Sequence, residues 1–355
     1  TLFPYTTLFR SSQGIGEAFT SDYDLPNDTA YGESCASIGL MMFARRMLEM
    51  EGDAHYADVM ERAFYNTVLG GMALDGKHFF YVNPLETYPK SIPHNHIYDH
   101  IKPVRQRWFG CACCPPNIAR TLVAIGHYLF TPRRDALFIN FYAGSEAQFT
   151  INDQPLALKI SGNYPWDEEV NITFSHPQAV QHTLALRLPE WCEAPQVLIN
   201  GEAAQGEQLK GYMHITRQWQ QGDIITLRLP MTLRRVYANP LVRHNAGKVA
   251  IQRGPLVYCL EEVDNGAELH NLSLPKASQI REIPGTGVLE GKIVLQAEGL
   301  RVLTAQEDKP LYSFDHRQTA VEKQTLTFIP WFSWANRGEG EMRIWINEAR
   351  SEERR

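Results

Sequence analysis

The sequence predicts a multidomain protein in which a helical segment is followed by two β-sandwich units. Apolar residues recur at helical spacing as far as about residue 131. From residue 132 the chain instead consists of short alternating runs separated by Gly, Pro, Asn and Asp, which is typical of sandwich strands. A chain of 355 residues is long enough for two or three domains, each with its own core.

Three helices are predicted in the first part of the chain. Residues 36–51 have helical periodicity and end at a glycine, and residues 55–72 repeat the pattern up to a glycine pair. The third helix, over residues 115–131, opens with Pro115, which suits the first helical position because its missing N–H would be unbonded there. Residues 73–106 are predicted to hold a short strand or hairpin and a polar loop. Because long loops join these helices, we expect them to belong to a larger helical array.

Two sets of strands are predicted after the helices, and together they set the domain boundaries. The strand-forming runs of the first set are residues 136–151, 155–166, 170–176, 183–191, 195–201 and 212–230. Those of the second set are residues 233–240, 248–261, 291–300, 324–338 and 341–347. The predicted organisation is a helical domain over 13–131, sandwiches over 132–232 and 233–347, and a solvated tail over 348–355.

The first eleven residues have a sequence unlike that of the predicted domains. "TLFPYTTLFRS", residues 1–11, has neither helical nor strand periodicity and no initiator Met, and it resembles the translation of a sequencing adapter. We therefore set residues 1–12 apart from the domains and expect them to add nothing to the fold. On this interpretation the chain is a C-terminal fragment of a longer protein.

Composition excludes several functional classes. Hydrophobic residues make up 44% of the chain and charged residues 21%, as in an ordinary globular protein. The net charge is −6 and the basic residues are dispersed, so no nucleic-acid partner is expected. No apolar run approaches the ~20 residues that a membrane span requires. Six cysteines are too few for a disulfide scaffold, which favours a reducing, cytoplasmic setting.

Half of the cysteines occur in "FGCACCPPN", residues 109–117, and Cys35 lies in "YGESCASIG". Cys113 and Cys114 directly precede a predicted helix, whose free N–H groups and dipole favour thiolates over thiols. Thiolates together with the carboxylate of Glu33 would select Zn²⁺ over hard cations. Three interpretations stay open at this point: a structural zinc knot, a catalytic zinc–thiolate centre, and unligated core cysteines.

Three stretches carry a resemblance to a known family. "GIGEAFTSDYDLPNDTAYGESCASIGLMMFA", "FGCACCPPNIART" and "FIPWFSWANRGEGEMRIWI" resemble glycoside hydrolase family 127, the β-L-arabinofuranosidase-like group, over about residues 13–347. The resemblance implies an (α/α)₆ barrel, present here only in part, followed by two β-sandwich domains. It also implies a retaining glycosidase acting on terminal β-L-arabinofuranosyl or related residues.

The resemblance assigns roles to individual residues. Zn²⁺ would be bound by Glu33, Cys35, Cys113 and Cys114, with Cys113 also the nucleophile. Glu17, in "GIGEAF", matches the general acid/base. The residues that match sugar contacts are Glu61 and Tyr81.

The resemblance and the composition also set expectations about partners. The substrate would be an oligosaccharide or glycoconjugate, with neither nucleic acid nor membrane as a partner, and a homodimer is the oligomer to test for. The alternative function is a non-catalytic, zinc-stapled module that binds carbohydrate or is purely structural.

Other chemically suggestive residues have simpler interpretations. The histidines of "PHNHIYDH", residues 93–100, suit a polar loop better than a metal site. Cys192 and Cys259 lie among predicted strands and are expected to be small core residues. The aromatic run "IPWFSWANRG", residues 329–338, could stack on sugar, but within a sandwich strand it is more often core.

Overall fold

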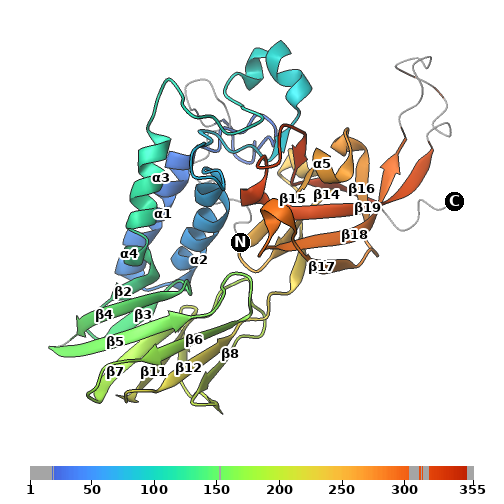
Figure 1. Cartoon of the computed structure of the whole chain (residues 1–355). Coiled ribbons are helices and arrows are strands. Elements are labelled where there is room, and N and C mark those ends of the chain that lie inside the picture. The colour runs from blue at the N-terminus through green and yellow to red at the C-terminus, as the bar shows by residue number, and fades with distance from the viewer. Residues whose placement is uncertain are drawn as a thin grey trace.

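The computed structural model of the chain describes residues 18, 20–151, 153–303, 312, 314 and 320–349. Figure 1 shows the helical segment standing on one β unit, with a second β unit beside it. Residues 1–11 and Glu17 lie outside the described residues. The predicted order, helices first and then two β units, is confirmed for the part of the chain that is described.

The helical segment matches two of its three predicted helices. Its elements are α1 (Ser34–Glu51), α2 (Ala54–Arg62), the π-helical η2 (Ala63–Val68), α3 (Cys114–Val123) and α4 (Gly126–Leu129). The single helix predicted over residues 115–131 is wrong, because the chain leaves the helix at Ala124 and Phe130–Pro132 form strand β2. Phe130 pairs with Ile139 of strand β3 (Ala136–Ile139), so sheet pairing overrides the helical periodicity there.

Helices α1 and α2 pack through one apolar face each. Ile38, Met41, Ala44 and Leu48 of α1 are buried at helical spacing, and their face packs into the same core as α2. Gly52 ends α1 in the left-handed conformation, with φ 65°, and donates its N–H to the Leu48 carbonyl.

The segment between α2 and α3 leads toward the second β unit. It contains β1 (Glu86–Thr87), η3 (Pro89–His94) and η4 (His96–Tyr98). β1 confirms the short strand predicted between residues 73 and 106, and it pairs antiparallel with β20 (Met342–Arg343). This pairing attaches the helical segment to the C-terminal sheet.

The first β unit is a sandwich of two sheets below the helices (Figure 1). One sheet has the order β10-β11-β7-β3-β2 and the other has the order β4-β5-β6-β12-β8-β9. Their remaining strands are β4 (Ser145–Ile151), β5 (Gln154–Ser161), β6 (Glu169–Phe174), β7 (Val180–Arg187), β8 (Gln196–Ile199), β9 (Glu202–Ala203), β10 (Glu207–Leu209), β11 (Tyr212–Trp219) and β12 (Ile224–Arg228). Alternating burial along β5 and β6 places the apolar residues between the two sheets.

The second β unit differs from the two-sheet sandwich that the sequence predicts. Its strands and β1 together form one ten-stranded sheet, and the additional β14–β15 pairing closes six of these strands into a ring. The strands are β13 (Leu233–Val236), β14 (Lys248–Arg253), β15 (Leu256–Glu261), β16 (Leu272–Pro275), β17 (Ile280–Pro284), β18 (Ile293–Val302), β19 (Val321–Pro330), β20 and β21 (Ile346–Ala349). Short helices α5 (Glu262–Asn265), η5 (Arg243–Asn245), η6 (Leu269–Asn271), η7 (Gly287–Leu289) and η9 (Trp331–Ser333) connect them. Closure gives hydrogen-bond partners to backbone N–H and C=O groups that would be unpaired at the edges of separate sheets.

One buried arginine joins the helical segment to this second unit. Arg105 donates to the Gly70 carbonyl from Nε at 3.0 Å and to the Trp334 carbonyl from Nη1. Trp334 stacks on Phe80 with ring centroids 4.7 Å apart, and it is almost fully buried. The aromatic run that contains Trp334 is therefore core, as the sequence predicts.

Within the described ranges, no helix is both long enough and apolar enough to cross a membrane.

Candidate functional site

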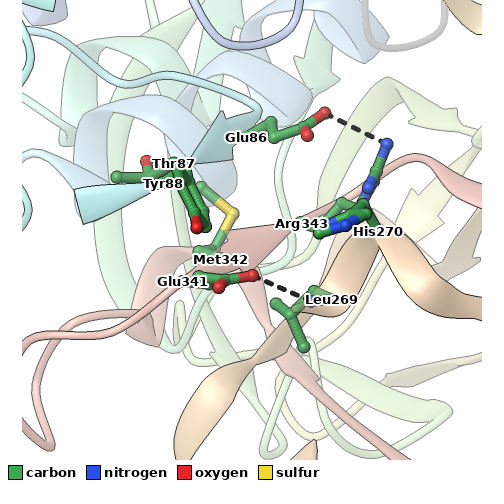
Figure 2. Close-up of a pocket in the computed structure, with 8 residues that line it drawn as sticks. All are labelled: Glu86, Thr87, Tyr88, Leu269, His270, Glu341, Met342 and Arg343. Carbon is green, nitrogen blue, oxygen red and sulfur yellow. Dashed lines mark hydrogen bonds and ion pairs between the residues drawn. The ribbon is translucent and has the colours of Figure 1, made fainter. Parts of the chain in front are cut away.

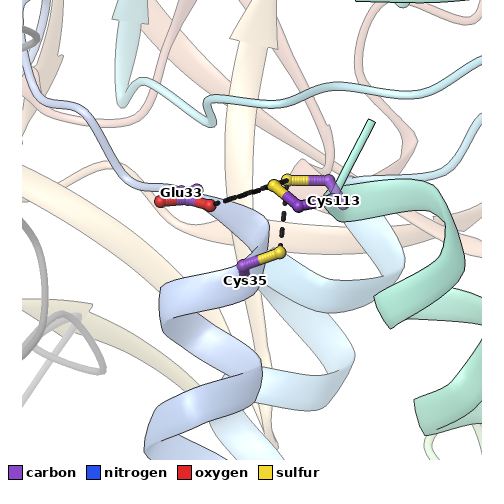
Figure 3. A group of neighbouring side chains, drawn as sticks. Glu33, Cys35 and Cys113 are labelled. Carbon is purple, nitrogen blue, oxygen red and sulfur yellow. Dashed lines mark hydrogen bonds between the residues drawn. The ribbon is translucent and has the colours of Figure 1, made fainter. Parts of the chain in front are cut away.

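Two helix N-termini bring the cysteine cluster together, which we define as Glu33, Cys35, Cys113 and Cys114. Glu33 immediately precedes α1 and bridges to Val82, while Cys35 lies in the first turn of α1. Cys113 caps α3, and Cys114 is its first residue. Figure 3 shows the Glu33 carboxylate directed at the sulfur of Cys113, which comes from a separate segment, with the Cys35 side chain beside them. Both helices therefore direct their free N–H groups and positive dipole ends toward the cluster.

The distances within the cluster are short and similar. Sγ of Cys114 lies 3.5 Å from Sγ of Cys35 and 3.8 Å from Sγ of Cys113. Oε1 of Glu33 lies 3.7 Å from the sulfur of Cys113 and 3.8 Å from that of Cys114. All four ligand atoms lie within 4.8 Å of one another.

These distances fit a tetrahedral metal site. Four ligands placed around Zn²⁺ at Zn–S distances of about 2.3 Å have sulfur atoms about 3.8 Å apart, because tetrahedral geometry multiplies the radius by roughly 1.6. Three sulfurs and one carboxylate oxygen are also the donor types that a soft-to-borderline cation prefers. The cluster could therefore hold a metal ion.

The three thiols of the cluster shift one another's pKa values. The neighbouring Cys114 thiol lowers the pKa of Cys35 to about 5, and Cys35 in turn raises the pKa of Cys114. Burial raises the pKa of Cys113 to about 11. A bound metal would favour the thiolate form of the three cysteines, since coordination deprotonates thiols outright.

Tyr81 connects the cluster to an open cavity. Its hydroxyl lies 3.3 Å from Sγ of Cys113, and the Tyr81 backbone carbonyl accepts from the Ser34 N–H. The cavity has a volume of about 400 Å³. It is lined by Tyr31, Tyr81, Val82, Asp99, His100, Lys102, Phe109, Gly110 and Cys111. Tyr81 therefore lines this cavity and also contacts Cys113, which is not itself a lining residue.

The structure places Glu61 apart from the cysteine cluster. Its carboxylate is 1% exposed, and it accepts hydrogen bonds from Tyr164, Arg187 and Trp191. All three partners belong to the sandwich below the helices. Arg187 also forms an ion pair with Asp58 of α2 at 2.6 Å. We call Asp58, Glu61, Tyr164, Arg187 and Trp191 the Arg187 cluster, and its contacts indicate that Glu61 joins α2 to the sandwich.

The other chemically suggestive residues fall as the sequence predicts. His94 and His96 are exposed, and among the described residues neither they nor His100 belong to a metal-compatible group. Cys192 and Cys259 are buried core residues. Cys111 is exposed and lies outside the four-ligand group.

The Arg187 cluster was not predicted from the sequence. The stronger sequence signal for it is an arginine that ends the apolar run "TLALR", at a position that a sandwich strand would bury. Asp58 and Glu61 lie three residues apart and therefore share one face of α2, which is a second, weaker signal.

Three family models match consecutive parts of the chain. The model described as "Beta-L-arabinofuranosidase, GH127 catalytic domain" matches residues 9–127. The model of the "GH127 middle domain" matches residues 136–231, and that of the "Glycoside hydrolase family 127 C-terminal domain" matches residues 233–347.

Known proteins are similar along nearly the whole chain. A non-reducing end β-L-arabinofuranosidase from Bifidobacterium longum subsp. longum is 39% identical over 352 residues, which is 96% of this chain and 52% of that protein. The crystal structure of Ara127N-Se, a GH127 β-L-arabinofuranosidase from Geobacillus stearothermophilus T6, superposes with a TM-score of 0.91 at 50% identity, over 96% of this chain and 53% of that one. A GH127 β-arabinofuranosidase structure gives a TM-score of 0.85 at 31% identity, over 96% and 53% of the two chains. The chain spans about half the length of these relatives.

Proposed function

Because the chain belongs to glycoside hydrolase family 127, we propose that it functions in a retaining glycoside hydrolase. The proposed reaction releases terminal β-L-arabinofuranosyl or related residues from oligosaccharides or glycoconjugates. The geometry of the cysteine cluster is the observation that carries this proposal. Three cysteine sulfurs and a carboxylate meet at two helix N-termini, and Tyr81, which lines an open cavity, contacts one of the sulfurs. We also propose that the helical segment, residues 13–131, belongs to an (α/α)₆ catalytic barrel.

Zn²⁺ is the metal that the cluster would hold, through Glu33, Cys35, Cys113 and Cys114. The spacing of the three sulfurs and the carboxylate oxygen supports this ligand set. When bound, Zn²⁺ supplies a positive charge that stabilises the thiolate form of Cys113. Cys111 is expected to take no part in binding the metal, because it lies outside the four-ligand group.

In the first step, Sγ of Cys113 attacks the anomeric carbon of the sugar. The carbon–sulfur bond forms as the glycosidic carbon–oxygen bond breaks, and Glu17 gives its proton to the leaving oxygen. The product is a glycosyl thioether on Cys113. Most retaining glycosidases use a carboxylate for this attack, so the thiolate replaces one member of the usual carboxylate pair.

In the second step, Glu17 takes a proton from water, and the water oxygen attacks the same carbon. The carbon–sulfur bond breaks and its electron pair returns to Sγ of Cys113 as thiolate. Two displacements at one carbon leave the configuration retained. Tyr81 is proposed to contact the sugar, since its hydroxyl lies 3.3 Å from the attacking sulfur.

The mechanism is tested by comparing Cys113→Ala with Glu17→Ala on aryl and alkyl β-L-arabinofuranosides. The assay uses the longest gene product that contains this sequence. Cys113→Ala should abolish turnover of every substrate, because no leaving group replaces a missing nucleophile. Glu17→Ala should lose about 10²–10⁴ in rate on alkyl glycosides and much less in the first step on activated aryl glycosides, which need little protonation.

Azide should then partly restore turnover by Glu17→Ala, with a product of retained configuration. Equal losses on both substrate types, or an inverted product, would contradict the thioether mechanism. Stoichiometric zinc in a gene product that hydrolyses neither substrate would instead favour the alternative, a zinc-stapled carbohydrate-binding or structural module.

A further inference from the structure

Residues 20–33 lie in the sequence between Glu17, the proposed acid/base, and helix α1, and we call them the acid/base segment. The segment ends at Glu33, a proposed metal ligand. Apart from the bridge at Glu33, it contains neither helix nor strand. Its backbone therefore lacks the regular hydrogen bonds that fix the neighbouring helices, and its position depends on contacts with other parts of the chain.

A buried pair of amides fixes the middle of the acid/base segment to the second β unit. Nδ2 of Asn27 donates to Oδ1 of Asn245 at 2.8 Å, and the two residues are 4% and 7% exposed. Asn245 is the last residue of η5, the short helix between β13 and β14. A buried donor that loses its acceptor is costly, so this pair strongly favours one position of the segment.

The start of the segment is held by charged side chains of the same short helix. The Asp24 carboxylate accepts from Nη2 of Arg243 at 2.6 Å, and the same oxygen lies 3.2 Å from Nε2 of His244. The Thr20 hydroxyl donates to the other oxygen at 2.7 Å, and this bond is the main reason that the pKa of the Asp24 carboxyl lies below its usual value. Arg243 is largely exposed, so its ion pair contributes less than the buried amide pair.

The segment also rests on a strand that belongs to the C-terminal sheet. The backbone carbonyl of Asn27 accepts from the N–H groups of Leu85 and Glu86, at 2.9 and 3.2 Å. Glu86 begins β1, which pairs with β20, and Figure 2 shows its carboxylate facing the guanidinium of Arg343, 3.5 Å away. Asn27 therefore contacts Asn245 directly and the C-terminal sheet by way of β1.

Chain geometry connects this anchoring to the proposed chemistry. Glu17 lies outside the described residues, but Thr20 follows it by three positions, and three residues of extended chain span at most about 11 Å. A fixed Thr20 therefore limits where Glu17 can lie. Glu33, at the other end, is held independently by its antiparallel bridge to Val82. Loss of the contacts to η5 should displace the end near Glu17 and leave the metal-ligand end in place.

We propose that η5 is a positioning element for acid catalysis, in which Asn245, supported by Arg243 and His244, holds the acid/base segment so that Glu17 reaches the leaving oxygen. This inference rests on the function proposed for Glu17. The three residues of η5 act on Glu17 through the segment and need no contact with the sugar. The second β unit thereby takes part in the reaction, in addition to packing against the helical segment.

The test compares Asn245→Ala and Arg243→Met with Asn265→Ala, in the longest gene product that contains this sequence. Asn265 is a buried asparagine of α5 in the same β unit, and its amide donates to the carbonyls of Glu261 and Thr327. It is the matched control, because its loss removes buried hydrogen bonds from the same unit at a place away from the acid/base segment.

Asn245→Ala should lose about 10- to 100-fold in rate on alkyl β-L-arabinofuranosides and less than about threefold in the first step on activated aryl ones, because a misplaced acid protonates the leaving oxygen poorly. Arg243→Met removes an exposed ion pair, so it should fold normally and show the same bias with a loss of about two- to fivefold. Both variants should keep the zinc content of the unchanged protein. Asn265→Ala should keep its alkyl-to-aryl rate ratio.

Hydrogen exchange gives a readout that needs no activity. The N–H groups of Leu85 and Glu86 bond to the Asn27 carbonyl, so they become free when the segment opens. In Asn245→Ala they should exchange about three- to tenfold faster, as expected for the loss of one buried hydrogen bond. In Asn265→Ala their exchange should stay the same.

Unchanged exchange in Asn245→Ala would overturn the inference, as would equal losses on alkyl and aryl glycosides in the two η5 variants. The positioning role fails alone when Glu17→Ala shows the loss on alkyl glycosides and the η5 variants do not. When Glu17→Ala lacks that selective loss as well, the function proposed for Glu17 fails together with the positioning role.

Discussion

The cysteine cluster and the Arg187 cluster both join α-helical residues to side chains distant in sequence, yet they differ in charge. In the Arg187 cluster, two carboxylates of α2 surround a guanidinium that is fully buried. In the cysteine cluster, three thiols and one carboxylate meet without a cationic side chain among the four. One cluster thus carries its counter-charge within the chain, and the other has donor atoms spaced for a cation from outside.

This difference indicates that the Arg187 cluster has a structural role, whereas the cysteine cluster has the composition of a metal site. Burial raises the pKa of Asp58 to about 6, and the positive charge of Arg187 opposes that rise. Such a balanced group fixes how α2 lies on the sandwich, and Glu61 belongs to it. Three thiols and a carboxylate whose ligand atoms lie within 4.8 Å of one another are instead typical of a metal site. Three changes test the distinction, from the largest expected effect on stability to the smallest.

Arg187→Met should be the most destabilising change. It leaves the carboxylates of Asp58 and Glu61 buried without their partner, and breaking a buried ion pair on one side costs about 3–5 kcal/mol. Denaturant unfolding measures the loss. Arg228→Met is the matched control, because Arg228 pairs with Glu169 at 3.2 Å on the exposed surface of the same sandwich. That change should cost less than about 1 kcal/mol, and equal losses in the two variants would contradict the role given to Arg187.

Zinc should stabilise the protein through the cysteine cluster alone. Free Zn²⁺ at about 100 times its dissociation constant raises the free energy of unfolding by about 2.7 kcal/mol, and a chelator should reverse the gain. Glu33→Ala and Cys35→Ala should lose this response, and Cys111→Ala should keep it. The reverse result, with zinc lost in Cys111→Ala and retained in Glu33→Ala, would show a four-cysteine knot in place of the proposed ligand set.

Glu61→Gln should have the smallest effect of the three. The amide keeps one acceptor oxygen but removes the charge that faces Arg187, so we expect a loss of about 1–3 kcal/mol and unchanged zinc content. The measurement is again denaturant unfolding, together with metal analysis. Unchanged stability combined with weaker sugar binding would restore the sugar-contacting role that the family resemblance assigns to Glu61.

Local sequence patterns were sufficient to predict much of the fold. The helix over Ser34–Glu51 follows from apolar spacing and from Gly52, because both act within a few residues of the chain. Alternation along the strands of the first β unit likewise follows from the pleat, since neighbouring side chains point to opposite faces. Cys113 and Cys114 stand next to a proline that marks a helix start, so their place at an N-terminus was also predictable.

Pairings between strands decided the rest. Phe130–Pro132 has helical periodicity in the sequence but becomes a strand, because β3 offers it backbone partners. The ring closure of the second β unit depends on β14 pairing with β15 and β21 in one register, which no single run of residues encodes.

The features of the candidate site likewise divide into those that the sequence predicts and those that depend on the tertiary structure. The sequence by itself indicated the residues of the candidate metal site, because thiols and carboxylates are side chains that can act as metal ligands. Only the tertiary structure decided that Glu61 pairs with Arg187, that Tyr81 lies against Cys113, and that Asn27 bonds to Asn245. Ligand chemistry is a property of side chains, whereas burial and partnership arise only when segments far apart in the chain pack together.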